Sequence, residues 1–307
     1  MRACRRWTWM SAAAILSSLM AAAAVITPSG AVSPGDNGRI VFASNRTGDN
    51  EIFSMAADGT DVRRLTFSPA DDIVPAWSPD GTKIAFASNR VAATSYDIFV
   101  MNADGTGLVN LTRSGQSDRF PAWSRDGSRI AFMSMRDGNG NFEIYVMGAD
   151  GSDPRRLTTT AGIEECCIDW GPGDAQLVFQ TRRDGNFEIY TMHPDGTAQT
   201  NITRHPAYDG TPTWSPGGNR IVFRSVRDRS NDFYTVPPTG GPATRIFHAG
   251  SSNRTPAWSP DGTKLVFSSD RTGNDDIWVM NINGTGMVNL TRAAGNDTTP
   301  DWQPLPR

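Results

Sequence analysis

A short segment built around tryptophan recurs along most of the chain. Its fullest copy reads PAWSPDG and spans residues 75–81. Successive tryptophans are 46, 47, 44, 44 and 44 residues apart. A fixed period of this length is typical of a propeller, a solenoid or an array. A chain of 307 residues can therefore form a single repeat domain, although it is long for one hydrophobic core. The six tryptophans are Trp77, Trp123, Trp170, Trp214, Trp258 and Trp302.

The residues within one period predict strands rather than helices. Residues 83–88 and 97–101 are rich in β-branched and aromatic side chains, and turns containing glycine or proline bound them. A third, shorter run includes residues 110–112, and the tryptophan segment itself gives an innermost strand. Asp-Gly and Asn-Gly pairs between the runs favour tight hairpins. Four antiparallel strands per period indicate a propeller blade.

The two ends of the repeat region predict how the ring closes. Strands of the Ile/Leu-x-Phe type number six, and so do the tryptophan strands, but the two sets are displaced by one repeat. The strand at Trp302 can complete the blade that Ile40 begins, which would leave no open sheet edge. We therefore expect an all-β, six-bladed β-propeller of four-stranded antiparallel blades, closed by the C-terminal strand. The six strands start at Ile40, Ile84, Ile130, Leu177, Ile221 and Leu265.

The first 31 residues read as a signal peptide, which leaves residues 32–307 as one propeller domain. Arginines precede an apolar run over about residues 7–26, and Ser29 and Ala31 provide small residues for cleavage. An uncleaved membrane anchor is the alternative, but a spanning helix needs about 20 predominantly apolar residues, and Ser11, Ser17 and Ser18 interrupt this run. No later segment is apolar enough to cross a membrane. We expect a secreted protein or one of the periplasm and cell envelope.

The repeat resembles that of the TolB-type, WD40-like β-propellers, in which Pro-x-Trp-Ser-Pro-Asp-Gly precedes Ile-x-Phe-x-Ser-x-Arg. The resemblance covers about residues 37–302. It implies a secreted or periplasmic six-bladed propeller that binds other proteins or glycans. TolB proper carries an additional N-terminal α/β domain, whereas only about residues 32–37 separate the signal segment from the first blade here. No Gly-x-Ser-x-Gly motif of a serine hydrolase occurs.

Each repeat also carries an arginine thirteen residues after its tryptophan, and Arg46 is the equivalent residue in the first repeat. An acid lies across the hairpin that follows the arginine. A charged binding rim is one interpretation. Because every blade has the two residues, we expect structural cross-strand ion pairs, worth about 0.2–1 kcal/mol each. The residues are Arg46, Glu51, Arg90, Asp97, Arg136, Glu143, Arg183, Glu188, Arg227, Asp232, Arg271 and Asp276.

A second polar position lies five residues before each tryptophan, where the inner strands begin. We call the face that carries the loops before these strands the top face, and we expect binding there. Carboxylates at the mouth of the ring could hold Ca²⁺ or receive basic side chains of a partner. The alternative is that each caps its loop or pairs with the nearby arginine, so we expect no cofactor and no metal. The residues are Asp72, Asp118, Glu165, Asp209, Asn253 and Asp297.

Two loops of the top face contain residue types that are frequent at interfaces. One loop carries His205, Tyr208 and Asp209, and another carries Arg119 and Phe120. Aromatic residues and arginine often anchor interfaces, so these five residues form a candidate recognition patch. The three histidines of the chain show no metal-ligand spacing.

The adjacent cysteines Cys166 and Cys167 interrupt the regularity of the repeat, where Ile168 replaces the usual proline. In an oxidising compartment they could form a strained, labile disulfide. Two packed thiols are the alternative.

These observations predict a non-enzymatic binding module and not an enzyme. The expected partner is an envelope or extracellular protein, or a glycan. A net charge of −3 argues against nucleic acid. We expect a monomer without a membrane span once the signal segment is cleaved. The alternative function is a glycan lyase or hydrolase that uses top-face carboxylates with a cation.

Overall fold

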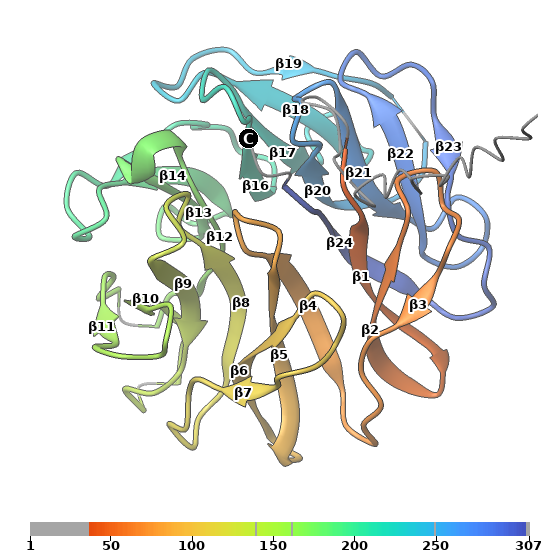
Figure 1. The fold of residues 1–307 in the computed structure, drawn as a ribbon. Coiled ribbons are helices and arrows are strands. Elements are labelled where there is room, and N and C mark those ends of the chain that lie inside the picture. Colours follow the sequence, from red (N-terminus) through yellow and green to blue (C-terminus); the bar gives the residue numbers. More distant parts are fainter. Residues whose placement is uncertain (1–36, 139, 161, 249, 305–307) are drawn as a thin grey trace, which may run out of the picture. The chain divides into compact units, whose positions relative to one another are not determined.

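The computed structural model describes residues 37–304, except for 139, 161 and 249. The predicted signal segment, residues 1–31, lies outside the described residues. The described part forms six four-stranded antiparallel sheets arranged around a common axis, which confirms the predicted fold (Figure 1). Its one helical element is η1 (Pro172–Asp174), a single 3-10 turn among the described residues.

We number the sheets as blades 1 to 6 in chain order, and in each blade the strands run from the axis outward. The outermost strand has only two residues in every blade. Blade 1 contains β24 (Asp297–Trp302), β1 (Ile40–Thr47), β2 (Asp49–Met55) and β3 (Arg63–Arg64); blade 2 contains β4 (Asp72–Trp77), β5 (Lys83–Ala92), β6 (Ser95–Asn102) and β7 (Val109–Asn110); blade 3 contains β8 (Asp118–Trp123), β9 (Arg129–Ser134), β10 (Glu143–Gly148) and β11 (Arg155–Arg156); blade 4 contains β12 (Glu165–Trp170), β13 (Leu177–Thr181), β14 (Glu188–Met192) and β15 (Thr200–Asn201); blade 5 contains β16 (Asp209–Trp214), β17 (Ile221–Ser225), β18 (Asp232–Val236) and β19 (Thr244–Arg245); blade 6 contains β20 (Asn253–Trp258), β21 (Lys264–Ser269), β22 (Asp276–Asn281) and β23 (Val288–Asn289).

The ring closes through blade 1, as the displaced strand counts predict. β24 pairs antiparallel with β1, with Ile40 opposite Trp302 and Ser44 opposite Asp297. The indole Nε1 of Trp302 donates a hydrogen bond to the carbonyl oxygen of Gly38 at 3.1 Å. The last described strand therefore supplies the inner edge of the first sheet.

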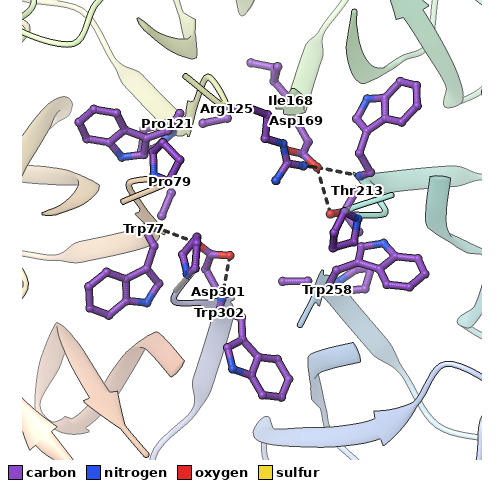
Figure 2. A pocket seen from close by; sticks show the side chains of 18 of the residues that line it. Trp77, Pro79, Pro121, Arg125, Ile168, Asp169, Thr213, Trp258, Asp301 and Trp302 are labelled. Carbon is purple, nitrogen blue, oxygen red and sulfur yellow. Dashed lines mark hydrogen bonds and ion pairs between the residues drawn. The ribbon is translucent and has the colours of Figure 1, made fainter. Parts of the chain in front are cut away.

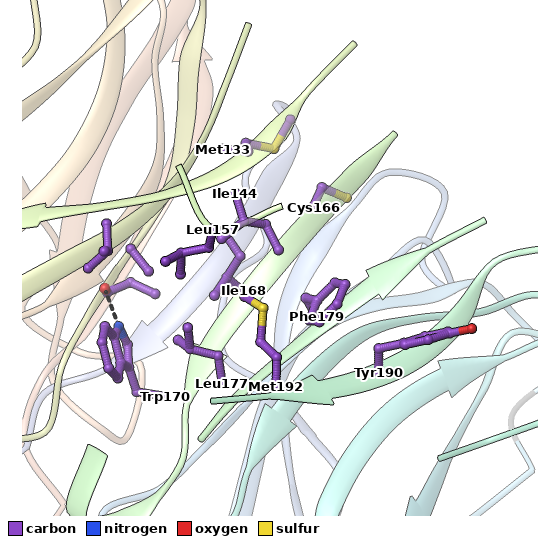
Figure 3. Close-up of a cluster of buried hydrophobic side chains, with 13 residues drawn as sticks. Met133, Ile144, Leu157, Cys166, Ile168, Trp170, Leu177, Phe179, Tyr190 and Met192 are labelled. Atoms are coloured by element: carbon purple, nitrogen blue, oxygen red, sulfur yellow. Dashed lines mark hydrogen bonds between the residues drawn. The ribbon is translucent and has the colours of Figure 1, made fainter. Parts of the chain in front are cut away.

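Each blade buries both of its faces against its neighbours, which explains why the second strands are apolar on both sides. Figure 3 shows one such layer, where Ile144 and Leu157 of blade 3 face Leu177 and Met192 of blade 4. The phenylalanine of each second strand is fully buried, and burial of such a side chain contributes about 1.5–3 kcal/mol. The six phenylalanines are Phe42, Phe86, Phe132, Phe179, Phe223 and Phe267.

Candidate functional site

The ring of polar residues at the start of the inner strands is neutralised from within the protein. All six residues are fully buried. Each contacts the arginine of its own blade, and this is the second of the two interpretations that the sequence leaves open. The contacts are Arg90–Asp72 at 2.6 Å, Arg136–Asp118 at 3.2 Å, Arg183–Glu165, Arg227–Asp209 at 2.8 Å, Arg271–Asn253 at 2.7 Å and Arg46–Asp297 at 2.7 Å.

The predicted pairing of each arginine with the acid across its hairpin is therefore wrong. The guanidinium of Arg90 lies over the rings of Phe86 and Phe99, at 5.6 and 5.0 Å from their centroids, and this stacking directs it toward the inner strand. Arg46, Arg136, Arg183, Arg227 and Arg271 stack and point in the same way. The hairpin acids instead contact polar side chains of the outer strand or of the loop after it. These acids are Glu51, Asp97, Glu143, Glu188, Asp232 and Asp276.

The two halves of the predicted recognition patch engage different neighbours. Arg119 lies over the ring of Tyr96, with its guanidinium 4.1 Å from the centroid. Tyr208 packs on Phe187, with ring centroids 5.3 Å apart. His205 Nδ1 accepts a hydrogen bond from the backbone N–H of Ala207 at 3.1 Å, and Asp209 belongs to the neutralised ring. Phe120 is the one predicted binding residue that lines the large cavity described next.

A cavity of about 830 Å³ lies on the axis, at the end of the inner strands that carries the tryptophans (Figure 2). All six inner strands line it, through the three residues before the tryptophan and the second residue after it. We call it the axial cavity. It lies toward the Ser-Pro-Asp-Gly turns and away from the polar ring, so the predicted top-face site includes little of its lining.

The inner strands share an unusual backbone conformation where they enter the axial cavity. The third residue before each tryptophan has a φ between 46° and 57°, and the ladder with the second strand shifts register there. Positive φ is uncommon for residues other than glycine and strained for β-branched ones. Its repetition in all six blades makes it part of the blade design. The residues, from blade 1 to blade 6, are Thr299, Val74, Phe120, Cys167, Thr211 and Thr255.

This ring of positive-φ residues gives the axial cavity two chemically different sides. Blades 2 to 4 contribute Val74, Phe120 and Cys167, whereas blades 5, 6 and 1 contribute threonines. The hydroxyl oxygens of Thr211 and Thr299 are buried and make no hydrogen bond within the described structure. The conformational preferences of these six residues do not predict a positive φ. Alignment of the repeats on their tryptophans does place the six residues at one equivalent position.

Two of the carboxylates that line the axial cavity belong to the inner strands of opposite blades. The residue before the tryptophan is Asp169 in blade 4 and Asp301 in blade 1, and it is alanine or threonine elsewhere. Asp301 accepts hydrogen bonds from the backbone N–H groups of Trp77 at 2.7 Å and of Trp302 at 2.8 Å. The bond to Trp77 also connects blade 1 to blade 2.

Asp169 occupies the equivalent place between blades 4 and 5 (Figure 2). Its carboxylate accepts bonds from the backbone N–H of Trp214 at 2.7 Å and from the hydroxyl of Thr213 at 3.1 Å. The guanidinium of Arg125 lies 3.7 Å away. Asp169, Asp301 and Arg125 were not among the residues singled out in the sequence, because a single acid in two of six repeats looks like ordinary variation.

The surroundings of Asp301 raise the pKa of its carboxyl group toward neutral pH. Burial raises the pKa of the Asp301 carboxyl to about 6, and the negative charge of Asp169 adds to this effect. The backbone N–H groups of Trp77 and Trp302 and the charge of Arg125 act in the opposite direction. An appreciable fraction of Asp301 therefore carries a proton in mildly acidic solution.

We expect the free energy of unfolding to increase as the pH falls from 7 to 4.5, partly through Asp301. Between the ordinary aspartate pKa of 3.8 and about 6, the folded protein binds a proton that the unfolded chain does not bind. Linkage then favours the folded state as the pH falls, whereas above pH 6 both states are charged and the contribution is constant. Urea unfolding at pH 7 and at pH 4.5 measures this effect. Between the two pH values, the free energy of unfolding should increase by about 1–2 kcal/mol less in Asp301→Asn than in the wild type. The exposed Asp153→Asn serves as a control, and an equal pH dependence in wild type and Asp301→Asn would contradict the assignment.

The adjacent cysteines are free thiols in the structure, with their sulfur atoms 3.0 Å apart. Cys166 is buried, and Cys167 lines the axial cavity. The hydrogen bond with Cys167, together with burial, raises the pKa of the Cys166 thiol. The disulfide stays a prediction. Within the described residues, no group of three or more His, Cys, Asp or Glu side chains is placed to hold a metal ion.

A closed six-bladed propeller with an axial cavity defines the structural class of this protein. Residues 69–167, 165–256 and 249–305 match the TolB beta propeller domain family, and the chain belongs to that family. TolB from Acinetobacter baumannii superposes with a TM-score of 0.76 at 22% identity, over 87% of this chain and 66% of that one. An oligogalacturonate lyase from Vibrio parahaemolyticus has a TM-score of 0.57 at 12% identity, over 83% and 74% of the two chains. At these identities the likeness shows the fold alone.

Curated relatives match over one repeat only. The Protein TolB homolog of Chlorobium luteolum is 53% identical over 47 residues, which are 15% of this chain and 11% of that protein. The homolog from Chlorobaculum tepidum is 52% identical over 48 residues, again 11% of its length. This chain thus covers about a tenth of these relatives. No helix in the described part of the chain has the length and hydrophobicity to cross a membrane.

Proposed function

We propose that this propeller is a non-enzymatic binding module of the periplasm or the extracellular space, and that its axial cavity receives a segment of another protein. The axial cavity carries the proposal. Its volume of about 830 Å³ lies within the range of about 300–1,000 Å³ that is usual for ligand sites. Its wall consists of inner strands that are hydrogen-bonded into six sheets. Such a wall is preorganised, which reduces the entropy lost on binding.

The chemistry of the top face supports binding over catalysis. A lyase or hydrolase would need carboxylates that reach its substrate, yet the side chains of Asp72, Asp118 and Asp209 are 0% exposed and paired with arginine. The axial cavity, in contrast, offers apolar groups and carboxylates around one volume. This mixture suits a folded or extended protein segment more than a uniformly hydroxylated glycan.

A cavity-blocking variant tests the proposal. Thr255 and Phe120 come from opposite blades and share the same positive-φ position. Because Phe120 already tolerates this conformation, Thr255→Phe should fold while placing a second aromatic ring in the axial cavity. We expect photo-cross-linking from the cavity position Thr211 to a cell-envelope protein, with the same cross-linked peptide in replicate experiments. Thr255→Phe should reduce this cross-link at least tenfold.

The matched control is Val109→Phe, which adds the same ring at an exposed position of the outermost strand β7. It should leave the cross-link unchanged. Equal cross-linking in wild type and Thr255→Phe would contradict the cavity as the binding site. Depolymerisation of an added polysaccharide by the purified protein would contradict the non-enzymatic role.

A further inference from the structure

On the basis of the binding function proposed above, we infer that the axial cavity recognises an arginine side chain of the inserted segment, held between Asp169 and Asp301. The inference starts from the charges that line the axial cavity. Among the residues that the structure describes, they are the four carboxylates of Asp80, Asp126, Asp169 and Asp301, and the single guanidinium of Arg125. A site with this balance attracts a cation and repels an acidic segment.

The four carboxylates are not equally available to a ligand. Asp80 is held in its own turn by Ser78 and Thr82, and Asp126 is held in the equivalent turn by serine side chains. Asp301 accepts only two hydrogen bonds, both from backbone N–H groups. A carboxylate offers about four acceptor sites, so Asp301 retains capacity for a donor from the cavity.

Asp169 lies in the blade opposite Asp301, so a cation near the axis feels both charges. Arg125 offsets part of the charge of Asp169, from a distance of 3.7 Å. Its Nε also donates a hydrogen bond to the carbonyl oxygen of Trp170 at 3.1 Å, so Arg125 is held beside Asp169 and competes with a ligand for that carboxylate. The asymmetry makes Asp301 the main anchor and Asp169 the second one.

The ring of positive-φ residues fits the rest of an arginine side chain. Val74 and Phe120 form an apolar wall on blades 2 and 3, between blade 1 with Asp301 and blade 4 with Asp169. An arginine stem can pack on such a wall while its charged end reaches a carboxylate. Five N–H donors in a fixed fork match several acceptors better than the compact ammonium group of lysine does.

A pair of isosteric peptides tests the inference. The probes are acetyl-Gly-Gly-Arg-Gly-Gly-amide and the same peptide with citrulline, which keeps the shape of arginine and removes its charge. We expect saturable binding of the arginine peptide by NMR titration at pH 7.5, and binding at least tenfold weaker for citrulline. Equal binding of the two peptides would overturn the inference. So would the absence of binding of the arginine peptide at 10-fold above the protein concentration that saturates the wild-type cross-link.

Variants of the two anchors locate the binding site. Asp301→Asn should weaken binding of the arginine peptide at least fivefold, and Asp169→Asn should weaken it less. Asp261→Asn is the matched control, because Asp261 holds a turn like that of Asp80 but does not line the axial cavity. It should leave binding unchanged. Equal affinities in Asp301→Asn and Asp261→Asn would refute the role of Asp301.

The pH dependence of wild-type binding gives a readout that needs no variant. Protonation of Asp301 removes one of the two charges, so the affinity for the arginine peptide should fall at least threefold between pH 7.5 and pH 5. Asp169, Asp80, Asp126 and Arg125 face the same volume, and Asp301→Asn should remove most of this pH dependence. If the cross-link to the envelope protein persists in Asp301→Asn, the binding module stands and the arginine inference fails.

Discussion

A chain that ends at residue 296 is expected to melt at least about 10 °C below the full-length protein, because it lacks β24. The deletion removes the partner of β1 and the buried Trp302. Loss of a buried tryptophan side chain alone costs about 3–5 kcal/mol, and each kcal/mol corresponds to about 2–4 °C for a large domain. It also leaves the side chain of Arg46 without Asp297.

Circular dichroism melts and limited proteolysis measure this effect. A chain that ends at Pro304 keeps all of β24 and serves as the control, with an expected melting temperature close to that of the full chain. Addition of a peptide of residues 295–304 to the shortened protein should restore part of the stability, because the peptide can occupy the vacant edge of β1. A shortened chain that melts within about 3 °C of the full-length protein would show that closure through blade 1 contributes little.

Arg227→Ala is expected to lower the free energy of unfolding by about 3–5 kcal/mol at pH 8, the cost of leaving a buried charge without its partner. Arg227 is the partner of Asp209, and their side chains are only 12% and 0% exposed. Burial already raises the pKa of Asp209, and Arg227 partly offsets that rise. Without the arginine, the charged carboxylate is costly at pH 8 and is neutralised as the pH falls, so the loss should be smaller at pH 5.

Urea unfolding of three further proteins separates charge from packing. Asp209→Asn in the Arg227→Ala background should recover part of the lost stability, because it removes the unpaired charge. Arg220→Ala changes an exposed arginine of the same blade and should alter the free energy of unfolding by less than about 0.5 kcal/mol. A loss in Arg227→Ala no greater than that in Arg220→Ala would mean that the buried pair is energetically neutral.

The spacing of the tryptophans predicted the blades and their closure because a fixed period leaves few arrangements open. The partners of Arg90 and Arg136 were mispredicted for a local reason. The acid nearest in sequence lies across the hairpin, but stacking on two aromatic rings turns each guanidinium toward the inner strand. Distance along the chain was a poor guide to distance in the sheet.

The axial cavity was largely hidden from sequence reasoning for a different reason. Positive φ at Val74 or Thr255 contradicts the intrinsic preference of these residues. The blade imposes it through the shifted ladder, which propensity does not encode. Asp169 and Asp301 belong to repeats far apart in the sequence, and only the circular arrangement places them on opposite sides of one volume.

The pairing of β24 with β1 has a consequence for folding during biosynthesis. Blade 1 receives its inner strand last, so a growing chain holds β1 with an unpaired edge until residue 302 has left the ribosome. Closure of the ring is thereby postponed until β24 has been made.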